Sequence, residues 1–229
     1  MHSLLLAVSV LAAASTLTTV LADDWYVPVC VTAAALLVTI ARRSGLSWEE
    51  LGLGPVSAQC GLDWGLVLAG AVLAVYLLAW HMPITHEAFK DKRAAGLPAA
   101  KQLFRVLVRV PFGTVLLEEV GFRGVLWALI TRLHGPAWAT AVSSTLFGFW
   151  HVPPSRGLTK ANSAAEGVFG TGTAGVIRSV AAAVVGTGIA GVLLCELRRR
   201  SGSLIAPMVV HCALNSFGYA SAWAAVRKR

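Results

Sequence analysis

Three small groups of polar residues lie inside otherwise apolar stretches of this 229-residue sequence. In chain order they are Glu118, Glu119 and Arg123; Phe147 and His151; and His211 and Asn215. A charged side chain at the centre of a bilayer costs about 2.5–3.5 kcal/mol on insertion scales. Groups of this kind therefore predict a buried polar site that performs chemistry or moves an ion.

The first group contains two adjacent carboxylates and one guanidinium. Glu119 and Arg123 are four residues apart, so they share a helix face and are expected to form an ion pair. Glu118 points away from that pair and has no local partner, and a desolvated carboxylate of this kind is suited to act as a general base. The alternative is that both glutamates are structural and are held by hydrogen bonds between helices.

The second group lies at the end of a predicted helix, because His151 is followed by Val152-Pro153-Pro154. A histidine at this position either interacts with the helix dipole or takes part in a site. Phe147 is on the same helix face and is expected to pack against its neighbours.

The third group, His211 and Asn215, again has four-residue spacing and lies well inside an apolar run. The Asn215 amide and an imidazole N–H are both donors suited to an oxyanion pocket. The alternative is polar contact between helices. Together, the three groups supply a base, a second imidazole and oxyanion donors, which suffice for attack of water on an amide without a covalent intermediate.

The composition indicates an integral membrane protein. Hydrophobic residues make up 56% of the chain and charged residues only 13%, against about 25% charged in a soluble domain. The net charge of +8 comes from residues at the ends of apolar runs, which anchor helices, so it does not indicate nucleic-acid binding. The four cysteines show no zinc-binding spacing, and we expect no disulfide.

The pattern of apolar runs predicts an all-α, polytopic transmembrane helix bundle of about seven spans (six to eight). The expected spans cover residues 4–21, 27–41, 62–80, 98–133, 136–151, 173–197 and 204–225. The first run also resembles a signal peptide, but we expect it to be retained. A short interfacial helix is expected after Ser47, a bend near Pro111, and a loop at 154–172.

These runs divide the chain into two parts of one integrated domain. Residues 1–97 contain N-terminal helices to which the sequence assigns no role, and residues 98–229 form a core that carries all three polar groups.

The patterns E-E-x-x-x-R, F-x-x-x-H and H-x-x-x-N, in this order on successive membrane helices, resemble the CAAX-protease and bacteriocin-processing family (CPBP, or Abi) of intramembrane proteases. The flanking sequences at 117–124 and 203–215 are also similar to signatures of that family. The resemblance covers about 109–217, and the first three predicted spans match nothing recognisable.

The resemblance implies an endopeptidase in which Glu118 polarises a water molecule together with His151. It implies that His211 and Asn215 stabilise the oxyanion, and that Glu119 and Arg123 form a supporting pair. It favours a site without a cofactor, although the family has also been described as metalloproteases. A zinc ion would be held by Glu118, His151 and His211.

Two other functions compete with this one: a proton- or ion-coupled transporter, and a membrane scaffold without catalysis. A protease requires the polar groups to converge on one water-accessible cavity, whereas a transporter would string them along the membrane normal. The expected partners are the lipid bilayer and a peptide or protein substrate. The Ala-, Gly- and Arg-rich composition indicates a bacterial cell membrane, and it argues against a prenylated substrate.

Overall fold

The computed structural model describes residues 2–227, apart from the side chain of Ile84, and is all-α. Its long helices are α1 (His2–Val20), α2 (Tyr26–Arg43), α3 (Ala58–His81), α8 (Pro136–Trp150), α12 (Gly172–Ser201) and α13 (Ile205–Arg227). A further helical run consists of α5 (Ala99–Phe104), η5 (Arg105–Val115), α6 (Leu116–Glu118), η6 (Glu119–Leu126) and α7 (Trp127–His134). The described chain has no strand, and only a single β-bridge joins Asp91 to Asn162.

Short helical turns complete the chain between these long elements. They are η1 (Asp23–Trp25), η2 (Pro55–Ser57), α4 (Pro83–His86), η3 (Glu87–Phe89), η4 (Lys92–Ala94), α9 (Val152–Ser155), α10 (Leu158–Ala161) and α11 (Ser163–Phe169). The segment expected as a loop between 154 and 172 therefore contains short helices.

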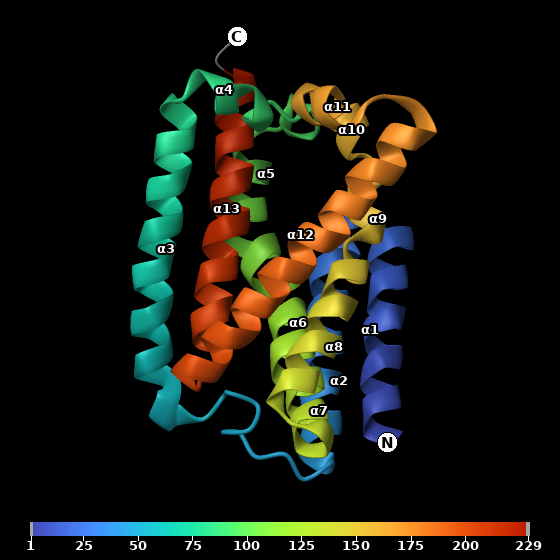
Figure 1. Cartoon of the computed structure of the whole chain (residues 1–229), viewed down its shortest axis with the longest axis vertical. Coiled ribbons are helices and arrows are strands. Elements are labelled where there is room, and N and C mark those ends of the chain that lie inside the picture. The colour runs from blue at the N-terminus through green and yellow to red at the C-terminus, as the bar shows by residue number, and fades with distance from the viewer. Residues whose placement is uncertain (1, 228–229) are drawn as a thin grey trace.

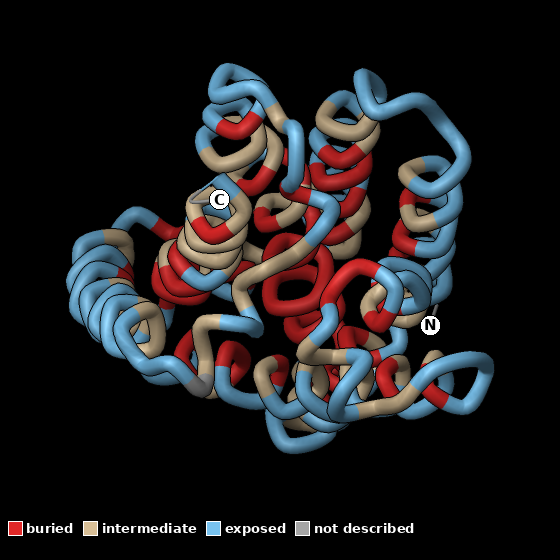
Figure 2. The backbone as a smooth tube through the Cα atoms, turned by 90° about the horizontal axis from the view of Figure 1, so that it is seen from above, coloured by how far each residue is buried: buried red, intermediate tan, exposed pale blue. Residues whose placement is uncertain are grey.

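The run from α5 to α7 passes through the middle of the bundle (Figure 1). In the same view α1 and α2 lie on one side of it, α3 and α13 lie on the other, and α12 crosses the front diagonally. Buried residues gather around this central run, whereas the outer faces of the peripheral helices are exposed (Figure 2). The central run is therefore the element that positions the polar groups.

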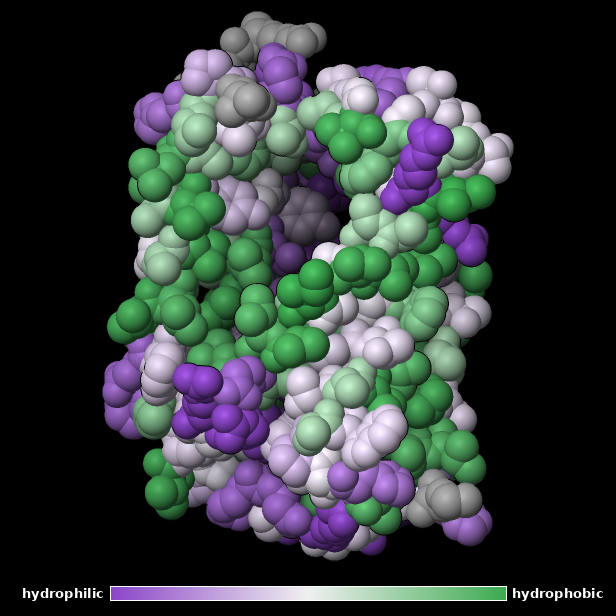
Figure 3. Space-filling view, in the orientation of Figure 1, coloured by the Kyte–Doolittle hydropathy of each residue, from purple (hydrophilic) through white to green (hydrophobic). Residues whose placement is uncertain are grey.

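The outer surface of the bundle is apolar, whereas several charged side chains are buried inside it. Large exposed apolar side chains include Leu66, Val67 and Leu78 on α3, and hydrophobic residues cover much of the face drawn in Figure 3. Within residues 2–227, four helices are long and apolar enough to cross a membrane, at 2–20, 23–43, 55–81 and 172–201. This distribution is that of an integral membrane protein, because lipid solvates apolar surface and penalises exposed charge.

The N-terminal helices share one hydrophobic core with the central run. Ala7 and Leu11 of α1 and Leu37 of α2 are buried in the same cluster as Leu117 and Phe122. The two parts of the chain expected from the sequence therefore pack directly against each other. All four cysteines are free thiols.

The central run departs from regular α-helix in two places. The segments 105–115 and 119–126 are π-helical, with hydrogen bonds that span five residues. Pro111 lies inside the first segment, so the irregularity expected at this proline takes the form of wider helical turns. Such π-helical turns are frequent at functional sites.

The expected interfacial helix after Ser47 is wrong, because only one turn forms there. The Glu50 N–H donates to Ser47 Oγ at 3.1 Å, and the Ser47 N–H donates to Glu50 Oε2 at 2.7 Å, as in a helix capping box. Gly52 then adopts a positive φ of 74° and ends the turn. The capping signal at Ser47 is therefore present, but Gly52 ends the segment before a helix forms.

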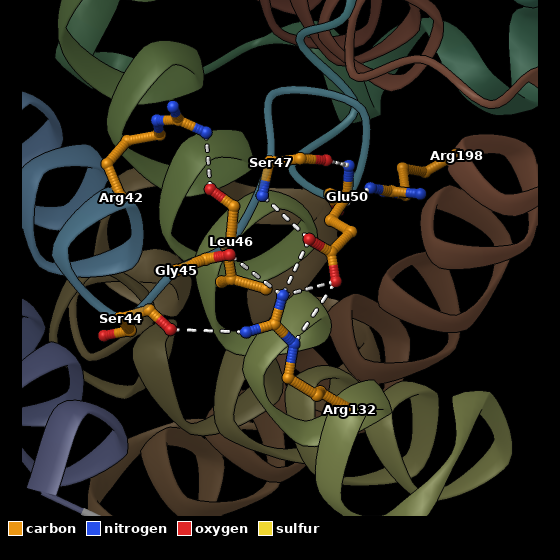
Figure 4. A network of polar contacts seen from close by, with 8 residues as sticks. All are labelled: Arg42, Ser44, Gly45, Leu46, Ser47, Glu50, Arg132 and Arg198. Carbon is orange, nitrogen blue, oxygen red and sulfur yellow. Dashed lines mark hydrogen bonds and ion pairs between the residues drawn. The ribbon is translucent and has the colours of Figure 1, made fainter.

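Arginines fasten this turn to three helices (Figure 4). The Arg132 guanidinium of α7 donates to both oxygens of Glu50, at 2.6 and 2.7 Å. Arg198 of α12 donates to the Glu50 carbonyl and, at 3.2 Å, to the carbonyl of Arg123 in η6. Arg42 of α2 donates to the Leu46 carbonyl at 2.6 Å.

Candidate active site

A buried ion pair and an imidazole form the centre of the site. Glu119 and Arg123 have fully buried side chains, and Arg123 NH1 donates to Glu119 Oε1 at 3.0 Å. The same oxygen lies 2.7 Å from His211 Nδ1. The Arg123 guanidinium also stacks on the Phe147 ring, 3.8 Å from its centroid. These contacts join η6, α8 and α13, each of which carries one of the three polar groups.

Glu118, the last residue of α6, is held through only one of its oxygens. Trp150 Nε1 donates to Glu118 Oε1 at 2.9 Å. The other oxygen, Oε2, is buried without a hydrogen-bond partner among the described residues and lies 3.7 Å from His211 Nε2. This separation is longer than a hydrogen bond, so Oε2 is a free acceptor that faces an imidazole nitrogen.

The end of α8 determines which nitrogen of the His151 ring carries a hydrogen. His151 Nδ1 lies 2.8 Å from the Phe147 carbonyl oxygen. A carbonyl oxygen only accepts, so Nδ1 donates, and a neutral imidazole then has its lone pair on Nε2. His151 therefore follows the last residue of α8 with Nδ1 engaged by the backbone.

Glu118, His151 and Asn215 line one cavity of about 620 Å³. Figure 3 shows the molecular face hollowed between α13 and α12, with hydrophilic residues in the recess. His211 is not on the cavity wall but stands directly beside Glu118. The polar groups from three helices thus converge on one place, which is the arrangement expected of a hydrolytic site.

The buried cluster brings together two carboxyl groups, one guanidinium and one imidazole. Buried charge is costly unless compensated. Glu119 is compensated by Arg123 at 3.0 Å, whereas Glu118 Oε2 lies 3.7 Å from His211 Nε2.

Several buried polar atoms in the cluster have no hydrogen-bond partner within residues 2–227. They are Glu118 Oε2, Glu119 Oε2, Arg123 Nε and Arg123 NH2. Such atoms are rare in native structures, and they mark positions that bind water or take part in catalysis. Donors and acceptors for a water molecule are thus present on both sides of the Glu119–Arg123 pair.

The sequence anticipated these positions but not all of their contacts. His211 was expected to face the oxyanion, yet its Nδ1 is engaged by Glu119, and only Nε2 remains directed toward Glu118. Trp150 was assigned no role, although it precedes His151 directly and binds Glu118. The sequence position of a tryptophan does not reveal which acceptor its indole N–H meets on another helix.

The N-terminal helices also contribute to the cavity wall, which the sequence did not predict. Tyr26 of α2 lines the cavity, and its hydroxyl lies 3.0 Å from Thr114 Oγ1 of η5. A Cβ on Gly113 would lie 2.8 Å from the Tyr26 ring, so a glycine is required for this close approach. This contact joins helices that are 88 residues apart in the chain.

A metal site does not assemble among the described residues. No three His, Cys, Asp or Glu side chains come together in residues 2–227 as ligands of one ion. Glu118 and His211, two of the three residues considered for zinc, face each other, but the described geometry does not complete the set. We therefore derive no chemical step through a metal.

One of three comparisons with known proteins gives a match. A family model described as "Type II CAAX prenyl endopeptidase Rce1-like" matches residues 100–217, just over half of the chain. All three polar groups lie inside this range, whereas α1, α2 and α3 lie outside it. No curated protein and no solved structure matches the chain.

Proposed function

Because the chain belongs to the Rce1-like family of type II CAAX prenyl endopeptidases, we propose that it is an intramembrane endopeptidase in which Glu118 activates a water molecule. The observation that carries this proposal is the position of Glu118. Glu118 lines a polar cavity, its Oε2 is a buried acceptor without a hydrogen-bond partner among the described residues, and its Oε1 is fixed by Trp150. A general base must be oriented and still have one oxygen free for the proton that it accepts.

In the proposed reaction, a water molecule in the cavity is held by Glu118 Oε2 and His151 Nε2. Glu118 accepts one proton of the water as the oxygen attacks the peptide carbonyl carbon. The proton then passes to the amide nitrogen of the leaving peptide, so that the C–N bond breaks and both carboxyl and amine products form. His211, beside Glu118, is placed to share this proton.

The negative charge on the carbonyl oxygen requires donors on the opposite side of the substrate. Asn215 lies on the cavity wall, and its amide N–H groups are suited to this task. The Glu119–Arg123 pair holds His211 through Nδ1, which orients Nε2 toward the reacting groups. These roles make Glu118, His151 and Asn215 the catalytic residues and His211, Glu119 and Arg123 their supporting cluster.

In this assignment the reaction proceeds without a metal ion. Separately, we propose that the protein lies in a bacterial cell membrane. Activity is expected to persist after treatment with a strong zinc chelator. Loss of activity that returns on addition of zinc would instead support a metal site at Glu118, His151 and His211.

The test compares the wild-type chain with Glu118→Gln and His151→Ala variants in purified membranes. The probes are two fluorogenic peptides with a C-terminal CAAX sequence, one farnesylated at its cysteine and one not, so that the need for a prenyl group is measured directly. In parallel, the membrane peptides of cells that express each variant are compared by mass spectrometry. Glu166→Gln, an exposed acid on α11, controls for loss of a carboxylate.

We expect Glu118→Gln to lower the cleavage rate by at least about a hundredfold, in the range known for general bases, while the helical circular dichroism signal is retained. Glu166→Gln should cleave as the wild type does. Equal cleavage by wild type and both site variants, in both assays, would remove the proposed roles of Glu118 and His151.

A further inference from the structure

The catalytic cavity contains a guanidinium that the proposed reaction does not use. Arg109 of η5 lines the same cavity as Glu118 and His151. Ionisable residues that face a cavity inside a membrane protein are rare and mark functional positions, and the hydrolytic steps described above do not require Arg109. Its position therefore needs a separate explanation.

The π-helical turns bring Arg109 to the same side of the helix as Glu118. The two residues are nine apart, which is about two and a half turns of a regular α-helix at 3.6 residues per turn. In a regular helix they would point in opposite directions. The wider turns of 105–115 change this, and Arg109, Thr114 and Glu118 all line the cavity.

Arg109 is held rigidly but is weakly neutralised. Its guanidinium lies over the Tyr26 ring, 3.8 Å from the centroid. Its ion-pair partner is Asp23 at 3.2 Å, whose side chain is 81% exposed, and such exposed pairs contribute little. The aromatic ring fixes the orientation of the guanidinium, while its capacity to bind an anion remains largely available.

The other guanidinium on the cavity wall is already occupied. Arg93 makes a bidentate pair with Asp91, with contacts of 2.6 to 3.1 Å. The Asp91 carboxylate is only 18% exposed, so the Arg93–Asp91 pair is better shielded from solvent than the Arg109–Asp23 pair. Of these two guanidinium groups, Arg109 is therefore the more available to a ligand, because its own partner is an exposed carboxylate.

We propose that Arg109 binds a carboxylate of the peptide substrate, supplied by its C-terminus or by an acidic side chain, a few residues from the bond that is cut. A guanidinium recognises a carboxylate through short, charge-assisted hydrogen bonds. Nine helical residues span at most about 13 Å along the axis, which equals about four extended peptide residues. This inference rests on the proposed protease function, because it gives the substrate's position in the same cavity.

The experiment measures binding rather than cleavage, so that its failure is distinguishable from failure of the proposed function. The full-length protein in detergent is titrated with N-acetyl-Ala-Ala-Leu as the free acid and as the C-terminal amide. A second pair, N-acetyl-Ala-Ala-Glu-amide and N-acetyl-Ala-Ala-Gln-amide, tests whether a side-chain carboxylate serves equally. Affinities are measured by isothermal titration calorimetry or thermophoresis.

We expect at least one acidic peptide to bind about tenfold or more tightly than its neutral partner, as a charge-assisted contact implies. Arg109→Gln should abolish this preference, and Arg109→Lys should retain part of it. Asp23→Asn removes the resident carboxylate and should strengthen binding of the acid. Lys101→Gln, an exposed cation on the preceding α5, should leave the preference unchanged.

Equal affinity for acid and neutral peptides in both pairs would overturn the proposal, as would undetectable binding of all four at millimolar concentration. A preference that survives in a folded Arg109→Gln protein would also overturn it. If that variant does not fold, the wild-type comparison and the Asp23→Asn variant still decide, because both leave Arg109 in place.

Discussion

Replacing Arg123 by methionine tests whether the buried ion pair holds the site together. Methionine keeps much of the side-chain volume but removes the positive charge that faces Glu119 at 3.0 Å. Because both side chains are fully buried, the variant leaves a carboxylate without its main counter-charge. Breaking a buried pair from one side costs about 3–5 kcal/mol.

The contacts of Glu119 indicate that the loss of stability lies near the lower end of that range. Glu119 keeps a second donor in His211, 2.7 Å from the same oxygen, and this bond partly compensates for the lost guanidinium. The variant also loses the stacking of Arg123 on Phe147 at 3.8 Å, which contributes on the order of 1 kcal/mol. We therefore expect the free energy of unfolding to fall by about 3–4 kcal/mol.

The assay is reversible unfolding of the full chain from mixed micelles, followed by circular dichroism. The matched control is Arg199→Met, which removes one of the two exposed arginine partners of Glu196, the other being Arg200. Its effect on the free energy of unfolding should be far smaller, because exposed pairs contribute little. The double variant Glu119→Gln with Arg123→Met should be more stable than Arg123→Met alone, because it leaves no uncompensated charge.

Two results would refute this reasoning. The first is an Arg123→Met cost no larger than that of Arg199→Met, which would show that the buried charge is solvated in some other way. The second is a double variant whose loss of unfolding free energy equals the sum of the losses in Glu119→Gln and Arg123→Met. Residues that interact directly must instead show a coupling energy.

Three further predictions concern other contacts. Trp150→Phe removes the donor to Glu118 Oε1 and should lower kcat by about tenfold or more with little change in KM; an unchanged kcat would show that this bond does not orient the base. Hydrogen bonds from Arg132 lower the pKa of the Glu50 carboxyl below its ordinary value of 4.5. The stabilisation from these hydrogen bonds is therefore present above pH 4.5 and is lost as the pH falls through the lowered pKa. Its size is small, because the Glu50–Arg132 pair is half-exposed. Thermal unfolding measured between pH 3 and 7 should show this loss in the wild type and not in Glu50→Gln. Gly148→Ala places a Cβ 2.6 Å from a backbone oxygen of α12 and should destabilise the protein by about 1–3 kcal/mol, and wild-type stability of this variant would contradict the packing of α8 on α12.

The sequence correctly predicted the all-α fold class and the approximate extent of the long helices. Apolar runs interrupted by Gly, Pro and Arg are local signals, and helix ends follow from them directly. The prediction of an interfacial helix after Ser47 was wrong. The capping hydrogen bonds form, but Gly52 ends the helical turn immediately after them. The capping signal at Ser47 and the terminating Gly52 compete, and the capping motif alone does not show which prevails.

The family was also predicted from the sequence, and the family match confirms it. Four-residue spacing is enough to predict that Glu119 meets Arg123, because the partners belong to one helix. Contacts between helices are different. No local pattern predicted that Trp150 donates to Glu118 or that His211 directs its Nδ1 to Glu119.

Sequence alone determined which residues carry charge within the membrane helices, because the cost of burying them leaves few explanations for their presence. Tertiary structure alone decided which of these charges face each other and which face the cavity. The placement of Arg109 shows the reason most clearly. Regular helical geometry directs it away from Glu118, and the π-helical turns, in which Arg109 stacks on Tyr26 of another helix, bring both residues to one cavity.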